Sequence, residues 1–145
     1  MEFRPALIDD VADILALWEI AAENDARPAD DAAKVVTLIE RDPDALELAL
    51  LDGRIVGTLI SGWDGWRAHL YRLAVHPDQR RSGIGRALLS RAERRLAALG
   101  ATRIDAMVLQ HNDLGQRIWT AEGYTEQEEW RRWVLPLPQG ADGSR

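Results

Sequence analysis

The chain has 145 residues, of which 46% are hydrophobic and 29% are charged, and its formal net charge is −6. This length suffices for one domain that buries a core of its own. The sequence contains no cysteine, which excludes disulfide bonds, a thiolate nucleophile and cysteine-ligated metal sites. No apolar run approaches the roughly 20 residues of a membrane span, and the first residues lack the regions of a signal peptide, so we expect a cytoplasmic protein without a membrane partner.

The charge is distributed unevenly along the chain. Residues 1–52 carry 14 acidic and four basic side chains, whereas residues 78–95 carry six arginines and two acidic side chains. The net acidity argues against a nucleic-acid partner, because affinity for phosphate backbones depends on a basic surface. The basic segment, residues 78–95, favours a bound anion, and the acidic third of the chain, residues 1–52, favours a cationic partner. The alternative for both segments is a solvated helix surface.

Hydrophobic periodicity and turn residues predict both helices and strands. Asp52-Gly53 is typical of a two-residue hairpin turn, Gly100 is typical of a helix end, and Asn112 is a favourable N-cap. The expected elements in chain order are a strand over 2–6, a helix with Asp9 or Asp10 as N-cap, a helix over 29–41, strands over 46–51, 54–61 and 67–75, a helix from Gly83 to Leu99, a strand over 102–109, a helix from Asn112 to Glu122 and a strand over 124–135.

The element order predicts the fold class and the domain boundary. We expect an α/β (α+β) domain over residues 1–135, with a mixed, mostly antiparallel sheet flanked by helices. The strand–helix–strand segment from Tyr71 to Leu109 requires a right-handed crossover. Residues 136–145 have almost nothing to bury and are expected to form a disordered tail.

A glycine-containing loop with the sequence LAVHPDQRRSGIGR, residues 73–86, connects a strand to the longest helix. Unpaired N–H groups at a helix start, with the positive end of the helix dipole behind them, form an anion site. Gly83 and Gly85 let the main chain approach a phosphate without a Cβ in the way. Three side chains can add charge-assisted hydrogen bonds to the same group: Arg80, Arg81 and Arg86.

Two common phosphate loops fit this segment badly. A Walker loop requires a lysine after its last glycine, and the dinucleotide fingerprint requires a third small residue where this chain has Leu88. The spacing Arg-x-x-Gly-x-Gly after a Leu-Ala-Val strand instead resembles the pyrophosphate loop of the GNAT superfamily of acyl-CoA-dependent N-acyltransferases. The segment from Asn112 to Gly123-Tyr124 resembles the second signature of that family, and the element order matches over about residues 1–135.

The resemblance implies the GNAT fold, acetyl-CoA as co-substrate and direct attack of an amine on the thioester, without an enzyme nucleophile. In this family the strand equivalent to residues 73–75 pairs with the pantetheine arm through its main chain and offers an N–H to the thioester carbonyl. No metal ligand is implied. The residues that would bind acetyl-CoA are Leu73, Ala74, Val75, Arg80, Arg81, Ser82, Gly83, Ile84, Gly85, Arg86, Asn112 and Trp119.

The chain departs from the family at two positions. Many members use a tyrosine seven residues after the helix-opening asparagine to protonate the thiolate. Here that position is Trp119, whose indole N–H is not a practical proton donor. Met107 stands where the branch that modifies the N-terminus of a ribosomal protein has a glutamate, which weakens that substrate assignment.

Two residues of strand 67–75 are candidate catalytic residues. His69 occupies the position at which the histone-acetylating branch has its general-base glutamate, and a histidine can accept an amine proton near neutral pH. The alternative is a half-exposed strand histidine without a role. Tyr71, on the same strand face, is an alternative acid or substrate contact. His76 and His111 are interpreted as turn residues.

The acceptor pocket of this family is built from the first two helices and the loop after the third strand, here the acidic third and residues 62–66. Acidic walls with Trp63 and Trp66 suit a cationic amine, either a small molecule or a peptide. Either tryptophan could equally pack within the hairpin or lie in a homodimer contact.

Three functions are weighed against one another. We favour an N-acetyltransferase acting on a primary amine, because an oxyanion donor and cofactor positioning need no special side chain. The first alternative is a catalytically weak CoA-binding regulatory module, which Trp119 and Met107 would suit. The second is a nucleotide-binding regulator, which ADP or NAD should stabilise as well as CoA does. The sequence identifies neither the acceptor nor whether a longer acyl group replaces acetyl.

Overall fold

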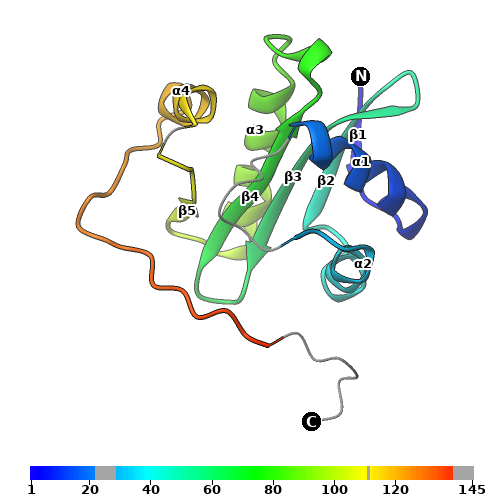
Figure 1. The fold of residues 1–145 in the computed structure, drawn as a ribbon. Coiled ribbons are helices and arrows are strands. Elements are labelled where there is room, and N and C mark those ends of the chain that lie inside the picture. The colour runs from blue at the N-terminus through cyan, green and yellow to red at the C-terminus, as the bar shows by residue number, and fades with distance from the viewer. Residues whose placement is uncertain (22–28, 111, 139–145) are drawn as a thin grey trace.

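The computed structural model describes residues 1–21, 29–110 and 112–138. These residues form a mixed sheet of five strands in the order β1-β2-β3-β4-β5 (Figure 1). Neighbouring strands from β1 to β4 run antiparallel, and β4 pairs with β5 in parallel. The strands are β1 (Glu2–Pro5), β2 (Leu46–Leu51), β3 (Arg54–Trp63), β4 (Ala68–Val75) and β5 (Ile104–Ala106).

The helices cover both faces of the sheet. Helices α1 (Val11–Ala21) and α2 (Ala32–Arg41) bury their apolar sides against one face, and α3 (Ile84–Leu99) covers the other together with the Trp119 end of α4 (Asp113–Ala121) (Figure 1). Single 3₁₀ turns, η1 (Ile8–Asp10) and η2 (Pro77–Gln79), precede α1 and α3. Alternate residues of β2 therefore enter different cores, as a strand with two covered faces requires.

Several local predictions are confirmed. Asp52 and Gly53 both have positive φ, 52° and 77°, in a tight turn that joins the antiparallel strands β2 and β3. Gly100 ends α3 in the left-handed region with φ 108°. The Asn112 side chain caps α4 by accepting the Gly115 N–H at 2.9 Å. Helix α2 begins later than the expected 29–41 because Asp31 is its N-cap and accepts the Lys34 N–H at 2.8 Å.

The strand expected over 124–135 is not formed. After the half-buried Tyr124, residues 125–138 run as an exposed segment without a strand partner, and Trp133 is 93% exposed (Figure 1). The physical reason is the local pattern: five charged residues stand within positions 126–132 and leave no apolar alternation that one sheet face could bury. Residues 136–138 are likewise exposed, and the remainder of the expected tail, 139–145, lies outside the described residues.

Candidate active site

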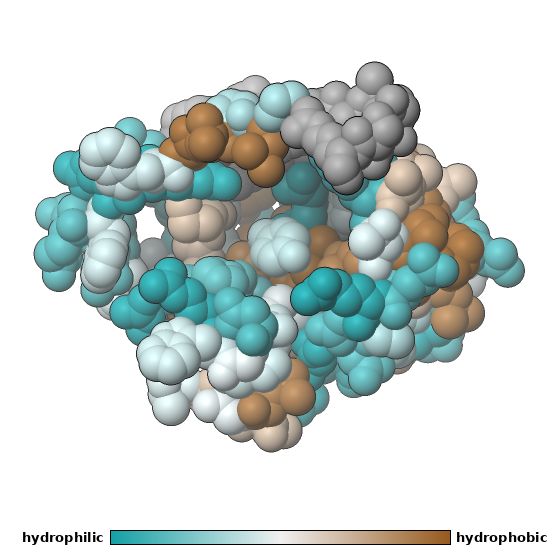
Figure 2. Space-filling view, turned by 90° about the horizontal axis from the view of Figure 1, so that it is seen from below, coloured by the Kyte–Doolittle hydropathy of each residue, from teal (hydrophilic) through white to brown (hydrophobic). Residues whose placement is uncertain are grey.

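A cleft of about 1670 Å³ runs along strand β4. At one end it is lined by residues 79–81 and 83–86, in the loop between β4 and α3 and at the start of α3, and at the other by residues 62–64, where β3 ends. Between them lie β4, the β5–α4 connection and the ends of α1 and α2. Figure 2 shows a hollowed face of the molecule, with apolar residues inside the hollow and hydrophilic residues around it. The cleft can therefore hold an elongated ligand along β4.

Strand β4 has a free edge on the cleft. It pairs with β5 only over Ala68–Leu70, opposite Ile104–Ala106, although β4 continues to Val75. The stretch 71–75 therefore keeps hydrogen-bonding main-chain groups on the side away from β3. Strands β4 and β5 therefore diverge after Leu70, which leaves the main chain of residues 73–75 open to pair with the pantetheine arm, as the family resemblance implies.

A bulge interrupts the same stretch of β4. Thr58 of β3 pairs with Ala74, and Ile60 pairs with Tyr71, so β4 has one residue more than β3 between these pairs. Arg72 lies in this bulge with φ 57°, a conformation that is unfavourable for residues other than glycine. The bulge changes which way the main chain of Leu73 faces.

The loop before α3 leads into a helix N-terminus whose first main-chain N–H groups have no partner within the helix. Ala87 is the first residue of α3 whose N–H bonds back, to the Gly83 carbonyl at 3.0 Å, so the amides of residues 84–86 precede the helical ladder. Arg81 and Gly83 have φ of 65° and 84°, which turns the chain sharply into the helix. The Ser82 hydroxyl donates to the Gln79 carbonyl and closes the turn.

The three arginines of the loop differ in their surroundings. All three line the cleft. Arg86 donates from Nε to Glu122 Oε1 at 2.8 Å, which ties the start of α3 to the end of α4. Arg80 and Arg81 are exposed, and neither makes an ion pair with another of the described residues. Within this loop, the arginines without an ion pair to another described residue are therefore Arg80 and Arg81.

Most other residues predicted to bind the cofactor also line the cleft, namely Leu73, Val75, Gly83, Ile84, Gly85, Asn112 and Trp119. The exceptions are Ala74 and Ser82. Ala74 is buried in the core under α1, and the Ser82 hydroxyl is taken by its own turn. These two residues can contribute only main-chain groups.

Trp119, on α4, forms an apolar wall of the cleft. Its ring is almost fully buried and meets Tyr124 edge to face, with 4.9 Å between ring centroids. The Tyr124 hydroxyl in turn donates to Glu93 of α3 at 2.7 Å. Burial is the main cause that raises the pKa of this phenol, and the hydrogen bond to Glu93 raises it further. Trp119 is thus fixed by packing, and its indole contributes apolar surface at the position where the family resemblance implies a tyrosine hydroxyl.

His69 and Tyr71 lie together at the far end of the cleft. His69 is half-buried and pairs with Gly62 of β3 and with Asp105 of β5. The Tyr71 hydroxyl lies over Gly62, where an added Cβ would come within 3.7 Å of it. Partial burial raises the pKa of the Tyr71 phenol, which keeps its proton at neutral pH.

The expected acidic wall is only partly present. Asp42 and Asp64 line the cleft, together with Trp63, whereas Trp66 does not. Asp64 accepts the N–H groups of Arg67 and Trp66 at 2.7 Å, which lowers its pKa and keeps it charged. Residues 22–28, which belong to the acidic third, and His111 lie outside the described residues.

Asp105 and Arg132 are among the lining residues that the sequence did not single out. Asp105 stands beside His69 because β4 and β5 pair in parallel register, which no local sequence signal reveals. Arg132 reaches the cleft from the segment after α4. Because residues 124–135 were expected to form a strand, nothing in the sequence indicated that Arg132 lines the cleft.

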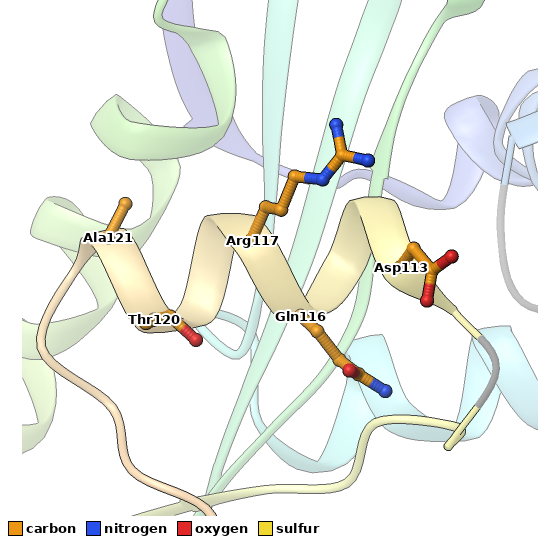
Figure 3. A pocket seen from close by; sticks show the side chains of 5 residues that line it. All are labelled: Asp113, Gln116, Arg117, Thr120 and Ala121. Carbon is orange, nitrogen blue, oxygen red and sulfur yellow. The ribbon is translucent and has the colours of Figure 1, made fainter.

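A second hollow of about 500 Å³ lies on α4, away from these residues. Figure 3 shows that its lining side chains do not converge, since Arg117 and Gln116 point in different directions. Among the described residues, no group of three or more His, Cys, Asp and Glu side chains could hold a metal ion. None of the helices in that part of the chain is long and apolar enough to cross a membrane.

Comparison with known proteins decides the family. The chain matches the family model of the acetyltransferase (GNAT) family over residues 8–131. An acetyltransferase of Sodalis glossinidius is 39% identical over 114 residues, which are 78% of this chain and 79% of that protein. An acetyltransferase of Pectobacterium atrosepticum is 40% identical over the same shares. The chain belongs to the GNAT acetyltransferase family.

Solved structures share the GNAT fold at low sequence identity. Ard1 from Thermoplasma volcanium has a TM-score of 0.75 and 18% identity, and the match covers 86% of this chain and 82% of that one. The aminoglycoside antibiotic 6′-N-acetyltransferase AAC(6′)-Ig from Acinetobacter haemolyticus has a TM-score of 0.72 and 18% identity, covering 95% and 100%. The predicted fold class is confirmed, and the chain is a GNAT-type N-acetyltransferase, a family that generally uses acetyl-CoA.

Proposed function

We propose that this GNAT acetyltransferase transfers the acetyl group of acetyl-CoA to a primary amine on a cationic acceptor, either a small molecule or a peptide. One observation carries the proposal: a single cleft runs from residues 79–86, along the free edge of β4, to His69. An anion site, a hydrogen-bonding strand edge and a candidate base thus lie along one elongated cavity, as an acyl transfer from a long phosphorylated thiol requires.

The loop end of the cleft suits the diphosphate of coenzyme A. The amides of residues 84–86 precede the helical ladder, and Arg80 and Arg81 can add charge-assisted bonds. A Cβ at Gly83 would meet no protein atom within 4 Å, so the space beside this glycine is open. Trp119 and Leu73 offer apolar surface for the pantetheine arm.

The proposed chemistry is direct aminolysis of the thioester. The acceptor amine forms the N–C bond and the C–S bond breaks, and the sulfur leaves with its electron pair. The N–H of Leu73 stabilises the negative charge on the carbonyl oxygen. His69 accepts the proton that the amine loses, directly or through water, and the thiolate takes a proton from solvent or from the Tyr71 hydroxyl.

A cationic acceptor is favoured by the groups around His69. Asp64 lies close enough to His69 to interact with it electrostatically, and Trp63 lines the same end. Asp105 pairs with His69 in strand register, but both of its carboxylate oxygens already accept from Arg103, so Asp64 is the stronger attraction for a cation. Asp64 keeps its charge because main-chain N–H groups lower its pKa. Carboxylates next to an aromatic ring attract an ammonium or guanidinium group.

The test is a turnover screen that follows thiol release from acetyl-CoA. The amines should include polyamines, aminoglycosides, amino acids and short peptides, since solved GNAT structures include an aminoglycoside acetyltransferase and a ribosomal-protein-S18-alanine N-acetyltransferase. We expect turnover with amines that carry a second positive charge. CoA binding without turnover on any amine would support the regulatory module instead, and a preference for neutral amines would contradict the cationic acceptor.

A further inference from the structure

Arg72, at the bulge of β4, is held by buried side chains from two other elements. The Thr58 hydroxyl of β3 donates to the Arg72 carbonyl at 2.9 Å. The indole Nε1 of Trp18 in α1 donates to the same hydroxyl oxygen at 2.8 Å. Thr58 is 0% exposed and Trp18 is 3% exposed, so water does not compete for these bonds.

The order of donors fixes the direction of the Thr58 hydroxyl hydrogen. A hydroxyl has one hydrogen to donate and two lone pairs to accept with. Because Trp18 can only donate, the Thr58 oxygen accepts from it and its own hydrogen goes to the Arg72 carbonyl. The two bonds form a one-way chain that ends on the main chain of β4.

The Arg72 side chain is held from the same side. Its guanidinium carbon lies 5.4 Å from the centre of the Trp18 ring, and its Nη2 donates to Asp30 Oδ1 at 2.8 Å. The positive φ of Arg72 is unfavourable for an arginine, so it persists only if surrounding contacts hold it. Trp18 thus contacts Arg72 by its ring face and, through Thr58, by its N–H.

The consequence for the active site follows from peptide geometry. The carbonyl of Arg72 and the N–H of Leu73 belong to one peptide unit, which is planar and trans, so they point in opposite directions. Fixing the carbonyl toward Thr58 therefore directs the Leu73 N–H away from Thr58. That N–H is the group to which the proposed function assigns the thioester carbonyl.

We infer that Thr58 and Trp18 are positioning residues for acetyl transfer: through the Arg72 carbonyl they set the direction of the Leu73 N–H. Neither side chain lines the cleft. The inference rests on the proposed function for its catalytic meaning, but the positioning itself can be measured without turnover.

The experiment compares Thr58→Val, which removes the hydroxyl at nearly the same size, with Thr58→Ser, which keeps it, and with Trp18→Phe. Loss of a whole oxyanion donor lowers kcat by roughly 10²–10³, so a misdirected donor in Thr58→Val should lower kcat about tenfold. KM for acetyl-CoA should stay within about twofold, since residues 79–86 are untouched, and Thr58→Ser should restore kcat. The Leu73 amide signal in NMR spectra should shift in Thr58→Val and in Trp18→Phe but not in Thr58→Ser.

Ser61→Ala is the matched control, because it removes another buried hydroxyl of β3, one that accepts from Arg95 and does not touch the bulge. It should leave the Leu73 signal in place and kcat within about twofold even if it lowers stability. An unshifted Leu73 signal in Thr58→Val overturns the inference whether or not the enzyme turns over. A wild-type chain that transfers no acetyl group, with a shifted Leu73 signal in Thr58→Val, refutes the proposed function and leaves the positioning intact.

Discussion

Gly57 of β3 packs directly against Ile84 and Leu88 of α3, and adding one methyl group there tests how the start of α3 is held against the sheet. An alanine would place its Cβ 2.8 Å from Ile84 Cγ2, 3.1 Å from Leu88 Cδ1 and 3.3 Å from Ala49 Cβ. Overpacking of this kind costs about 1–3 kcal/mol, and the reduced freedom of the unfolded chain offsets about 0.4–1 kcal/mol. We expect Gly57→Ala to lower the free energy of unfolding by about 1–2 kcal/mol on balance.

A double-mutant cycle identifies the cause. Ile84→Ala alone removes the nearest methyl group and should cost about 2–5 kcal/mol. In the combined variant the Gly57→Ala methyl enters the vacated space, so the total cost should be smaller than the sum by at least about 1 kcal/mol. Urea unfolding followed by tryptophan fluorescence measures all four corners, and additive costs would refute the packing argument. Because Ile84 opens α3, Gly57→Ala should also weaken CoA binding.

Three further predictions concern the two ends of the cleft and the pH dependence of stability. Replacing Arg80 and Arg81 together with alanine should raise Kd for CoA about tenfold or more, whereas Arg86→Ala should have a smaller effect because Glu122 already pairs with it; titration calorimetry compares them. His69→Ala should lower kcat by about 10² or more, with partial rescue by added imidazole, and unchanged turnover would exclude it as the base. The Arg4 guanidinium donates to both Asp10 oxygens at 2.7 and 3.1 Å and lowers the pKa of the Asp10 carboxyl. The ion pair therefore stabilises the fold fully above the unfolded-state pKa of Asp10, and this stabilisation is lost as the pH falls through the folded-state pKa. Asp10→Asn should therefore reduce stability at pH 7 and make less difference at pH 2, and an equal loss at both pH values would contradict this.

The parts of the fold that were predictable are those encoded by neighbouring residues. Asp52-Gly53 and Asn112 act through their own backbone or the next turn, so their roles are local and were read correctly. The strand predicted over 124–135 is not formed, because a strand needs a partner and an apolar face and the charged stretch 126–132 offers no such face.

The site shows the same division between local and distant causes. The glycines and arginines of the loop lie in one sequence segment, and the structure brings them to one end of one cleft. The pairing of Arg86 with Glu122 joins residues 36 positions apart and has no sequence signal. The left-handed conformation of Arg72 was equally hidden, because arginine gives no indication of it and the causes, Thr58 and Trp18, lie on other elements.

A crystal structure of the chain with coenzyme A tests the central claim most directly. The account predicts the diphosphate on the amides of residues 84–86, with Arg80 and Arg81 beside it and the thiol end next to the Leu73 main chain. Coenzyme A bound with its diphosphate elsewhere, or with its thiol end away from the free edge of β4, would contradict it.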